Sequence, residues 1–161
     1  MLTTVFLSLD SVFAGAALRF FGVNRKYWVL ASSVMGLADL LALFLGRALH
    51  GWILTSMSSR QQGILFACCA LAAILAGKRY ANYPRAMIVG MAVLFSIDNV
   101  LAGAQLRSIV SAAHIAPTAA ILSGLACLSG LQFAHAVADR VHPRTSFALA
   151  TLAVSICFLL V

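Results

Sequence analysis

Two segments of this chain repeat each other at an interval of 88 residues, and each places an aspartate in the middle of an apolar run. The first segment is Ser8–Arg19 and the second is Ser96–Arg107, and they align without a gap. Eight of the twelve columns are identical: Ser, Asp, Val, Ala, Gly, Ala, Leu and Arg. A fold for this chain must therefore give a carboxyl group a place inside apolar surroundings, and must do so twice.

The apolar runs around the two segments predict a membrane protein. Hydrophobic residues make up 63% of the chain and charged residues 9%, whereas a soluble domain carries roughly 25% charged residues. A run of about 20 apolar residues spans the hydrocarbon core as a helix. We therefore expect an all-α integral membrane protein, a single domain over 1–161, with six transmembrane helices at about 1–21, 27–49, 62–77, 85–106, 115–138 and 146–161.

The basic residues predict the orientation of these helices, because loops rich in Lys and Arg stay in the cytoplasm. With both termini outside, loops one, three and five hold eight of the eleven basic residues, and the outer loops hold only Arg47, Arg60 and Arg107. We expect a multi-pass protein of the cell inner membrane. The net charge of +7 is then a consequence of topology, and no nucleic-acid partner is expected because the charges form no continuous patch.

The repeat extends beyond the two aspartate segments. At the same interval, Gly36–Leu40 aligns with Gly124–Leu128, which places Cys127 opposite Asp39. Repeat one then covers about 1–77 and repeat two about 85–161. Three helices is an odd number, so the second repeat would enter the membrane upside down, as in many secondary transporters with a site near the membrane midplane. Small residues are expected to let the helices approach closely, chiefly Gly15, Gly36, Gly46 and Gly103.

The four acidic residues of the chain are Asp10, Asp39, Asp98 and Asp139, and the first three lie well inside expected spans. An aspartate at the centre of a span costs roughly 2.5–3.5 kcal/mol. No Lys or Arg lies near the centre of any span to offset this cost, which leaves a proton or a bound cation. Carboxylate, hydroxyl and amide oxygens suit Mn, Mg or Ca. We therefore expect a metal- or proton-binding site at Asp10, Asp39 and Asp98, with supporting ligands Ser8, Ser11, Ser96 and Asn99.

These motifs resemble those of the MntP-type manganese efflux pumps, in the LysE superfamily of small six-helix exporters. Members carry a Ser-x-Asp-Ala-x-Ala-type motif in helices one and four, similar to Ser8–Gly15 and Ser96–Gly103 here. An acidic residue in helix two corresponds to Asp39. The resemblance implies that Asp10, Asp39 and Asp98 are manganese ligands or proton carriers. The residue after each motif aspartate is Ser11 or Asn99 here instead of Ala.

Two further groups of residues are candidates for function. Gln132, His135 and Asp139 lie at i, i+3 and i+7 near the expected cytoplasmic end of a helix, where they would form a proton relay or simply meet the headgroups. Four cysteines fall within spans and are interpreted as buried apolar residues: Cys68, Cys69, Cys127 and Cys157. A thiolate at Cys127 would instead favour a softer metal.

Together these features predict a secondary transporter that exports Mn²⁺ against protons. The chain has no phosphate-binding loop motif, so an ion gradient would supply the energy, and no prosthetic group is expected. The partners would be lipid, a divalent metal ion and protons, and the small size is compatible with a homodimer. The alternatives are a LysE-type exporter of another substrate, such as cadmium or an amino acid, and a non-transporting scaffold subunit. No enzyme is expected, because no nucleophile is paired with a base.

Overall fold

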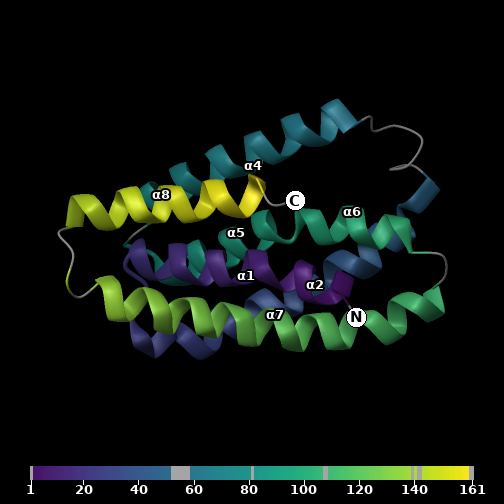
Figure 1. Ribbon diagram of the computed structural model, residues 1–161, viewed down its shortest axis with the longest axis horizontal. Coiled ribbons are helices and arrows are strands. Elements are labelled where there is room, and N and C mark those ends of the chain that lie inside the picture. The colour runs from purple at the N-terminus through teal and green to yellow at the C-terminus, as the bar shows by residue number, and fades with distance from the viewer. Residues whose placement is uncertain are drawn as a thin grey trace.

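The computed structural model describes residues 2–51, 59–80, 82–106, 109–138, 140 and 143–159, and these are almost entirely helical (Figure 1). In chain order the helices are α1 (Leu2–Phe20), α2 (Trp28–Ala48), α4 (Ser59–Arg79), α5 (Pro84–Phe95), α6 (Ile97–Gln105), α7 (Ile109–Ala138) and α8 (Pro143–Leu159). A short 3₁₀ turn, Arg25–Tyr27, precedes α2.

Each of the six expected apolar runs coincides with a helix or, for 85–106, with the consecutive pair α5 and α6. Two helices begin before their expected apolar runs: α4 begins at Ser59 with a polar first turn, and α7 begins at Ile109. Three described helical stretches are long and apolar enough to cross a membrane by length and composition: Arg25–Ala48, Pro84–Gln105 and Ala113–Val137.

The helices run roughly along one direction, so that their connections gather at the two ends of the bundle (Figure 1). The connections α1–α2, α4–α5 and α7–α8 lie at the same end, on the left of Figure 1. Most basic residues occupy this end, including Arg19, Arg25, Lys78 and Arg85. The uneven distribution of charge expected from the sequence is therefore also an asymmetry of the folded molecule.

The turn after α1 illustrates how the chain reverses at this end. Gly22 has φ +99°, a left-handed conformation that glycine adopts without steric cost. The amide of Val23 donates to the carbonyl of Leu18 at 3.0 Å, and the amide of Gly22 donates to that of Arg19 at 3.0 Å. These two bonds form a Schellman motif, which satisfies the last carbonyls of the helix.

Burial in this bundle differs from that in a soluble protein on the outer surface and at one place in the core. Large apolar side chains on the outer faces of α2 and α7 are exposed, among them Leu37, Leu41 and Phe133. Seven polar or charged side chains are instead buried, namely Asp10, Ser11, Asp39, Ser96, Asp98, Asn99 and Ser123. An apolar exterior around a core that is apolar except for this polar cluster suits a lipid environment, where the solvent is itself apolar.

Candidate functional site

Four helices meet around the buried polar residues. α1 contributes Asp10 and Ser11, α2 contributes Asp39, and α7 contributes Ser123. The remaining residues come from the junction of α5 and α6, where Ser96 separates the two helices. All three aspartates predicted from the sequence are therefore brought together, each with less than a tenth of its surface exposed.

Glycines allow the backbones of these helices to approach closely. A Cβ atom at Gly15 would overlap the backbone of Cys127, and one at Gly130 would overlap the carbonyl oxygen of Val12, so α1 lies directly against α7. In the same way, the backbone of α2 at Gly46 lies against α6 at Val100. The expected packing role of small residues is thus seen at each of the four predicted glycines, Gly15, Gly36, Gly46 and Gly103.

Asp10 and Asp98 form the first part of the site. Their carboxyl groups lie within hydrogen-bonding reach of each other, and the charge of Asp39 acts on both. A hydrogen bond between two carboxyl groups needs a proton between them, because an ionised carboxylate only accepts. This arrangement can therefore hold a proton, and it can release that proton when a cation takes its place.

Asp39 forms the second part and is held by hydroxyl groups. Ser96 donates to one of its carboxylate oxygens and Ser123 donates to the other. The hydroxyl of Ser96 also lies 2.8 Å from the carbonyl oxygen of Ala92 in the preceding turn. Since a serine hydroxyl has one hydrogen, Ser96 can serve either Asp39 or the helix backbone, but not both fully at once.

Ser11 connects the two parts. Its amide donates to Oδ1 of Asp10 at 2.6 Å, and its Oγ lies 3.3 Å from the same oxygen. That Oγ also lies 2.6 Å from the Oγ of Ser123. Ser11 was expected as a supporting ligand, whereas Ser123 was not, because a single serine on an apolar helix gives no sequence signal until its neighbours are known.

Two buried polar atoms of this site lack a hydrogen-bond partner among the described residues. They are Oδ1 of Asp98 and Nδ2 of Asn99. The side chain of Asn99 lies beside Asp39, but its amide nitrogen makes no well-formed hydrogen bond to an acceptor of the described residues. A buried group left unsatisfied costs about 1–3 kcal/mol, and a ligand or water between helices would satisfy both atoms.

The site as it stands is not a closed metal centre. In the described part of the chain, no group of three or more His, Cys, Asp or Glu side chains is arranged to hold a metal ion. The donor set nevertheless consists of carboxylate, hydroxyl and amide groups, which suits hard divalent cations.

The second predicted polar cluster lies elsewhere and has a different character. His135 contacts Arg19, whose Nη2 lies 3.2 Å from Nδ1 of the ring, and it also contacts Arg25. The indole of Trp28 packs edge-on against the same ring, with centroids 5.5 Å apart. Gln132 is exposed, and Asp139 lies outside the described residues. The structure does not bring Gln132 or His135 to the carboxyl groups, since His135 follows Ser123 on α7 by about 18 Å of helical rise.

The supporting groups are also only partly described. The side chain of Ser8 and that of Cys157 lie outside the described residues, whereas Cys69 and Cys127 are buried and Cys68 is exposed. Cys127 lies close enough to Asp39 and Asp10 for their charges to act on its thiol.

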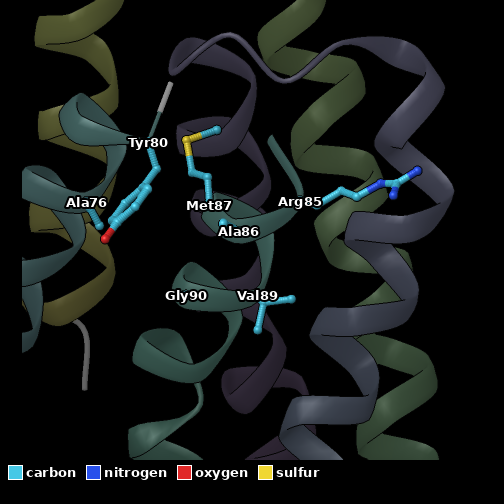
Figure 2. Close-up of a pocket in the computed structure, with 7 residues that line it drawn as sticks. All are labelled: Ala76, Tyr80, Arg85, Ala86, Met87, Val89 and Gly90. Atoms are coloured by element: carbon cyan, nitrogen blue, oxygen red, sulfur yellow. The ribbon is translucent and has the colours of Figure 1, made fainter. Parts of the chain in front are cut away.

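A groove of about 610 Å³ lies at the loop end of the bundle between α4 and α5. Figure 2 shows Tyr80 and Met87 on one side of it, while Arg85 extends away. Its lining is mainly apolar and contains no aspartate, being formed by Ala76, Tyr80, Arg85, Ala86, Met87, Val89 and Gly90. The groove is therefore separate from the carboxyl site.

Comparison with known proteins gives no match among family models, curated proteins or solved structures. The functional argument therefore depends on the geometry of the buried site.

Proposed function

We propose that this protein is a secondary transporter that exports a divalent cation, Mn²⁺, in exchange for protons. The observation that carries the proposal is the convergence of Asp10, Asp39 and Asp98 inside an otherwise apolar bundle. The described partners of Asp39 and Asp98 are hydroxyl, amide and carboxyl groups, and none of them is basic. Intramembrane carboxylates of this kind typically mark ion pathways and proton relays.

We further propose six spans arranged as two inverted repeats, and the glycine contacts support this arrangement. Gly15 lies against Cys127 and Gly103 lies against Leu43. Suppose that α1 corresponds to α5 and α6 at an interval of 88 residues, and that α2 corresponds to α7 at an interval of 84 residues. Gly15 then corresponds to Gly103 and Leu43 to Cys127, so the two contacts are equivalent. The contact of Gly46 with Val100 matches that of Gly130 with Val12 under the same rule.

The close contact of Gly36 with Ala120 joins two residues that are also 84 apart. This contact would then lie on the symmetry axis between the repeats. In this register Asp39 corresponds to Ser123, one helical turn away from the Cys127 that the sequence alignment suggests. The shift favours an oxygen-based site, since Cys127 is not the equivalent of a carboxylate.

The proposed mechanism is exchange at one site. On the cytoplasmic side, Mn²⁺ displaces the proton shared by Asp10 and Asp98, and Asp39 turns from its serines to complete the coordination. Ser8, Ser96 and Asn99 supply neutral oxygen atoms. The helices then rearrange, the site opens to the outside, and protons replace the metal. Both loaded forms are close to neutral, whereas the empty charged form is costly to move through a low-dielectric bundle.

The experiment compares manganese tolerance in cells that lack their own manganese exporter. Wild-type protein should protect the cells, and Asp10→Asn and Asp98→Asn should abolish protection while the protein is still found folded in the membrane. Ser129→Ala is the matched control, because Ser129 is exposed and its hydroxyl donates only to Leu125 of its own helix. Full protection by either aspartate variant would overturn the proposal.

The same panel distinguishes the other roles. A structural scaffold that uses the aspartates for helix packing would lose protein from the membrane in both variants. An exporter of cadmium or of an amino acid would leave manganese tolerance unchanged in the wild type and would protect against that substrate instead.

A further inference from the structure

We propose that Arg19, Arg25 and Trp28 form a binding site for the phosphate group of an anionic phospholipid. The site lies at the end of the bundle that carries the α1–α2 and α7–α8 connections (Figure 1). Arg19 lies in the last turn of α1, Arg25 in the 3₁₀ turn, Trp28 at the start of α2, and His135 in the last turn of α7. The inference requires a lipid bilayer but is independent of the proposed transport, because none of these residues belongs to the carboxyl site.

Hydrogen-bond donors converge on the imidazole ring of His135 from two sides. Nη2 and Nε of Arg19 lie 3.2 Å and 3.3 Å from Nδ1 of the ring. The guanidinium of Arg25 contacts the other ring nitrogen, Nε2. A neutral imidazole offers one acceptor nitrogen and a protonated imidazole offers none, whereas arginine only donates. At least one of the two arginines therefore faces an N–H group of the ring, and the cluster presents more donors than the ring can accept.

Trp28 adds another donor to the same cluster. Its indole packs edge-on against His135, and Cζ of Arg25 lies 5.6 Å from the indole centroid. The indole Nε1 is buried and has no hydrogen-bond partner among the residues that the structure describes. An indole nitrogen can only donate, so the group that satisfies it has to supply an acceptor. Phosphate oxygens are suitable acceptors, and arginine binds phosphate through paired N–H···O bonds.

The charge of the neighbouring segments also favours an anion. Lys26 follows Arg25 in the α1–α2 connection, Arg140 follows α7, and both side chains are exposed. The only acidic residue in these segments of the sequence is Asp139, because the other three aspartates of the chain belong to the carboxyl site. Basic residues therefore outnumber acidic ones at this place, whatever Asp139 contacts.

The surroundings indicate that the phosphate belongs to a lipid. Val29, next to Trp28, and Phe133, two residues before His135, are exposed apolar side chains. Apolar surface thus begins within one turn of the charged groups, and tryptophan typically lies at the boundary between membrane and water. A phospholipid matches this order, with its phosphate at the arginines and its acyl chains beside the apolar helices. Basic sites between membrane helices on the cytoplasmic side bind anionic headgroups in this way.

A lipid at this site is expected to stabilise the fold. Two guanidinium groups around one ring repel each other, and an anion between them offsets that repulsion. The headgroup would also link the two halves of the chain, because Arg19 and Arg25 come from the first half and His135 from the second. A ligand that binds only the folded state raises its stability.

The test measures lipid binding to the purified whole chain in detergent, by native mass spectrometry and by thermal unfolding. The probes are dioleoylphosphatidylglycerol, which is anionic, and dioleoylphosphatidylcholine, in which a positive group compensates the phosphate. Phosphatidylglycerol should bind about tenfold more tightly, the factor that corresponds to roughly one hydrogen bond to a charged group, and should raise the unfolding midpoint more. Equal binding of the two lipids would overturn the proposal.

Variants of the site should weaken this binding selectively. Arg19→Gln and Arg25→Gln should each lower the affinity for phosphatidylglycerol by about tenfold. Trp28→Phe keeps an aromatic ring and removes only the N–H, so the affinity should fall by about threefold. Lys78→Gln is the matched control, because it removes one exposed positive charge at the same end of the bundle, on α4, and should bind as the wild type. Equal losses in Lys78→Gln and in the arginine variants would show a diffuse attraction of charge and overturn the site.

Competition identifies the source of the phosphate. Inorganic phosphate in large excess should not displace phosphatidylglycerol, because it lacks the apolar chains that lie beside the helices. Displacement by inorganic phosphate would show a site for a soluble anion and would reject the lipid. Lipid binding is measured without Mn²⁺, so its outcome and that of the manganese-tolerance experiment can fail separately.

Discussion

At the scale of single residues, the site consists of carboxyl groups that differ in their partners. The carboxyl groups of Asp10 and Asp98 lie within hydrogen-bonding reach of each other. The carboxylate of Asp39 instead accepts hydrogen bonds from Ser96 and Ser123. The pair suits the storage of a proton, and the third carboxylate suits the reception of one. This division of roles depends on neutral serines as much as on the acidic residues.

The relation between Asp39 and Ser123 can be tested by exchanging them. Asp39→Ser should abolish Mn²⁺ export because the carboxylate is lost, and adding Ser123→Asp should restore a measurable part of it. The reason is that, in the proposed register of the repeats, residue 123 corresponds to residue 39 and Ser8 corresponds to Ser96, and Ser11 lies within reach of residue 123. The measurement is Mn²⁺ flux in proteoliposomes for both single variants and the double variant. Equal inactivity of Asp39→Ser and of the double variant would show that the two positions are not equivalent.

The sequence predicts most of this residue-level description, but not all of it. The three aspartates, together with Ser11, Ser96 and Asn99, stand out because polar groups are costly in apolar spans. Ser123 could not be found in this way, because serines are common on membrane helices and only the fold shows that this one faces Asp39. The pairing of Cys127 with Asp39 came from sequence identity, whereas the register that we propose from the glycine contacts pairs Asp39 with Ser123, one turn away.

At the scale of helices, the closest contacts join helices from different halves of the chain. Gly15 and Gly130 bring α1 against α7, while Gly46 and Gly103 bring α2 against α6. Each of these helix pairs is fixed at two points less than one turn apart on α1 or α6. The same kind of contact joins α2 to α7, where a Cβ atom at Gly36 would overlap the carbonyl oxygen of Ala120.

Substitution of one contact glycine tests this packing. Gly130→Ala should destabilise the protein by about 1–3 kcal/mol, as overpacking typically does, because the new methyl group would overlap the backbone of Val12. Gly90→Ala is the matched control, since no atom lies within 4 Å of a Cβ at that position and alanine favours a helix by about 1 kcal/mol. Thermal unfolding in detergent should show a lower midpoint for Gly130→Ala only. Equal midpoints in the two variants would contradict the close approach of α1 and α7.

The sequence also predicts where the helices lie better than it predicts their breaks and ends. Each apolar run of the sequence coincides with a helix or with the pair α5 and α6, and three of the described helical stretches are long and apolar enough to cross a membrane. The break at Ser96 was not foreseen, since the segment 85–106 is apolar enough as a whole to predict one continuous helix. The polar first turn of α4 was missed because hydropathy marks the part of a helix in lipid, whereas the helix itself continues until its backbone finds other partners.

At the scale of the whole molecule, charge is distributed unevenly between the two ends. The end that carries the α1–α2, α4–α5 and α7–α8 connections holds most of the basic residues (Figure 1). If that end faces the cytoplasm, as the positive-inside rule indicates, both termini lie outside.

Reporter fusions test this orientation. An alkaline phosphatase domain, which is active only outside the cytoplasm, should be active when fused to the C-terminus and inactive when fused in the α4–α5 connection near Asn82. The control is a fluorescent protein that matures only in the cytoplasm, which should give the opposite pattern. Activity at both positions or at neither would reject the odd number of spans expected between these two positions.

The partners of Asp39 have a consequence for how the protein is made. Both serines that satisfy this carboxylate, Ser96 and Ser123, are translated after it. While the ribosome is still completing the second half of the chain, the carboxylate of Asp39 lies in or near the bilayer without its two serine partners. The early half is thus expected to depend on the later half for its final insertion, and a newly made chain that stalls between them would present an unsatisfied acid to the cell's membrane quality control.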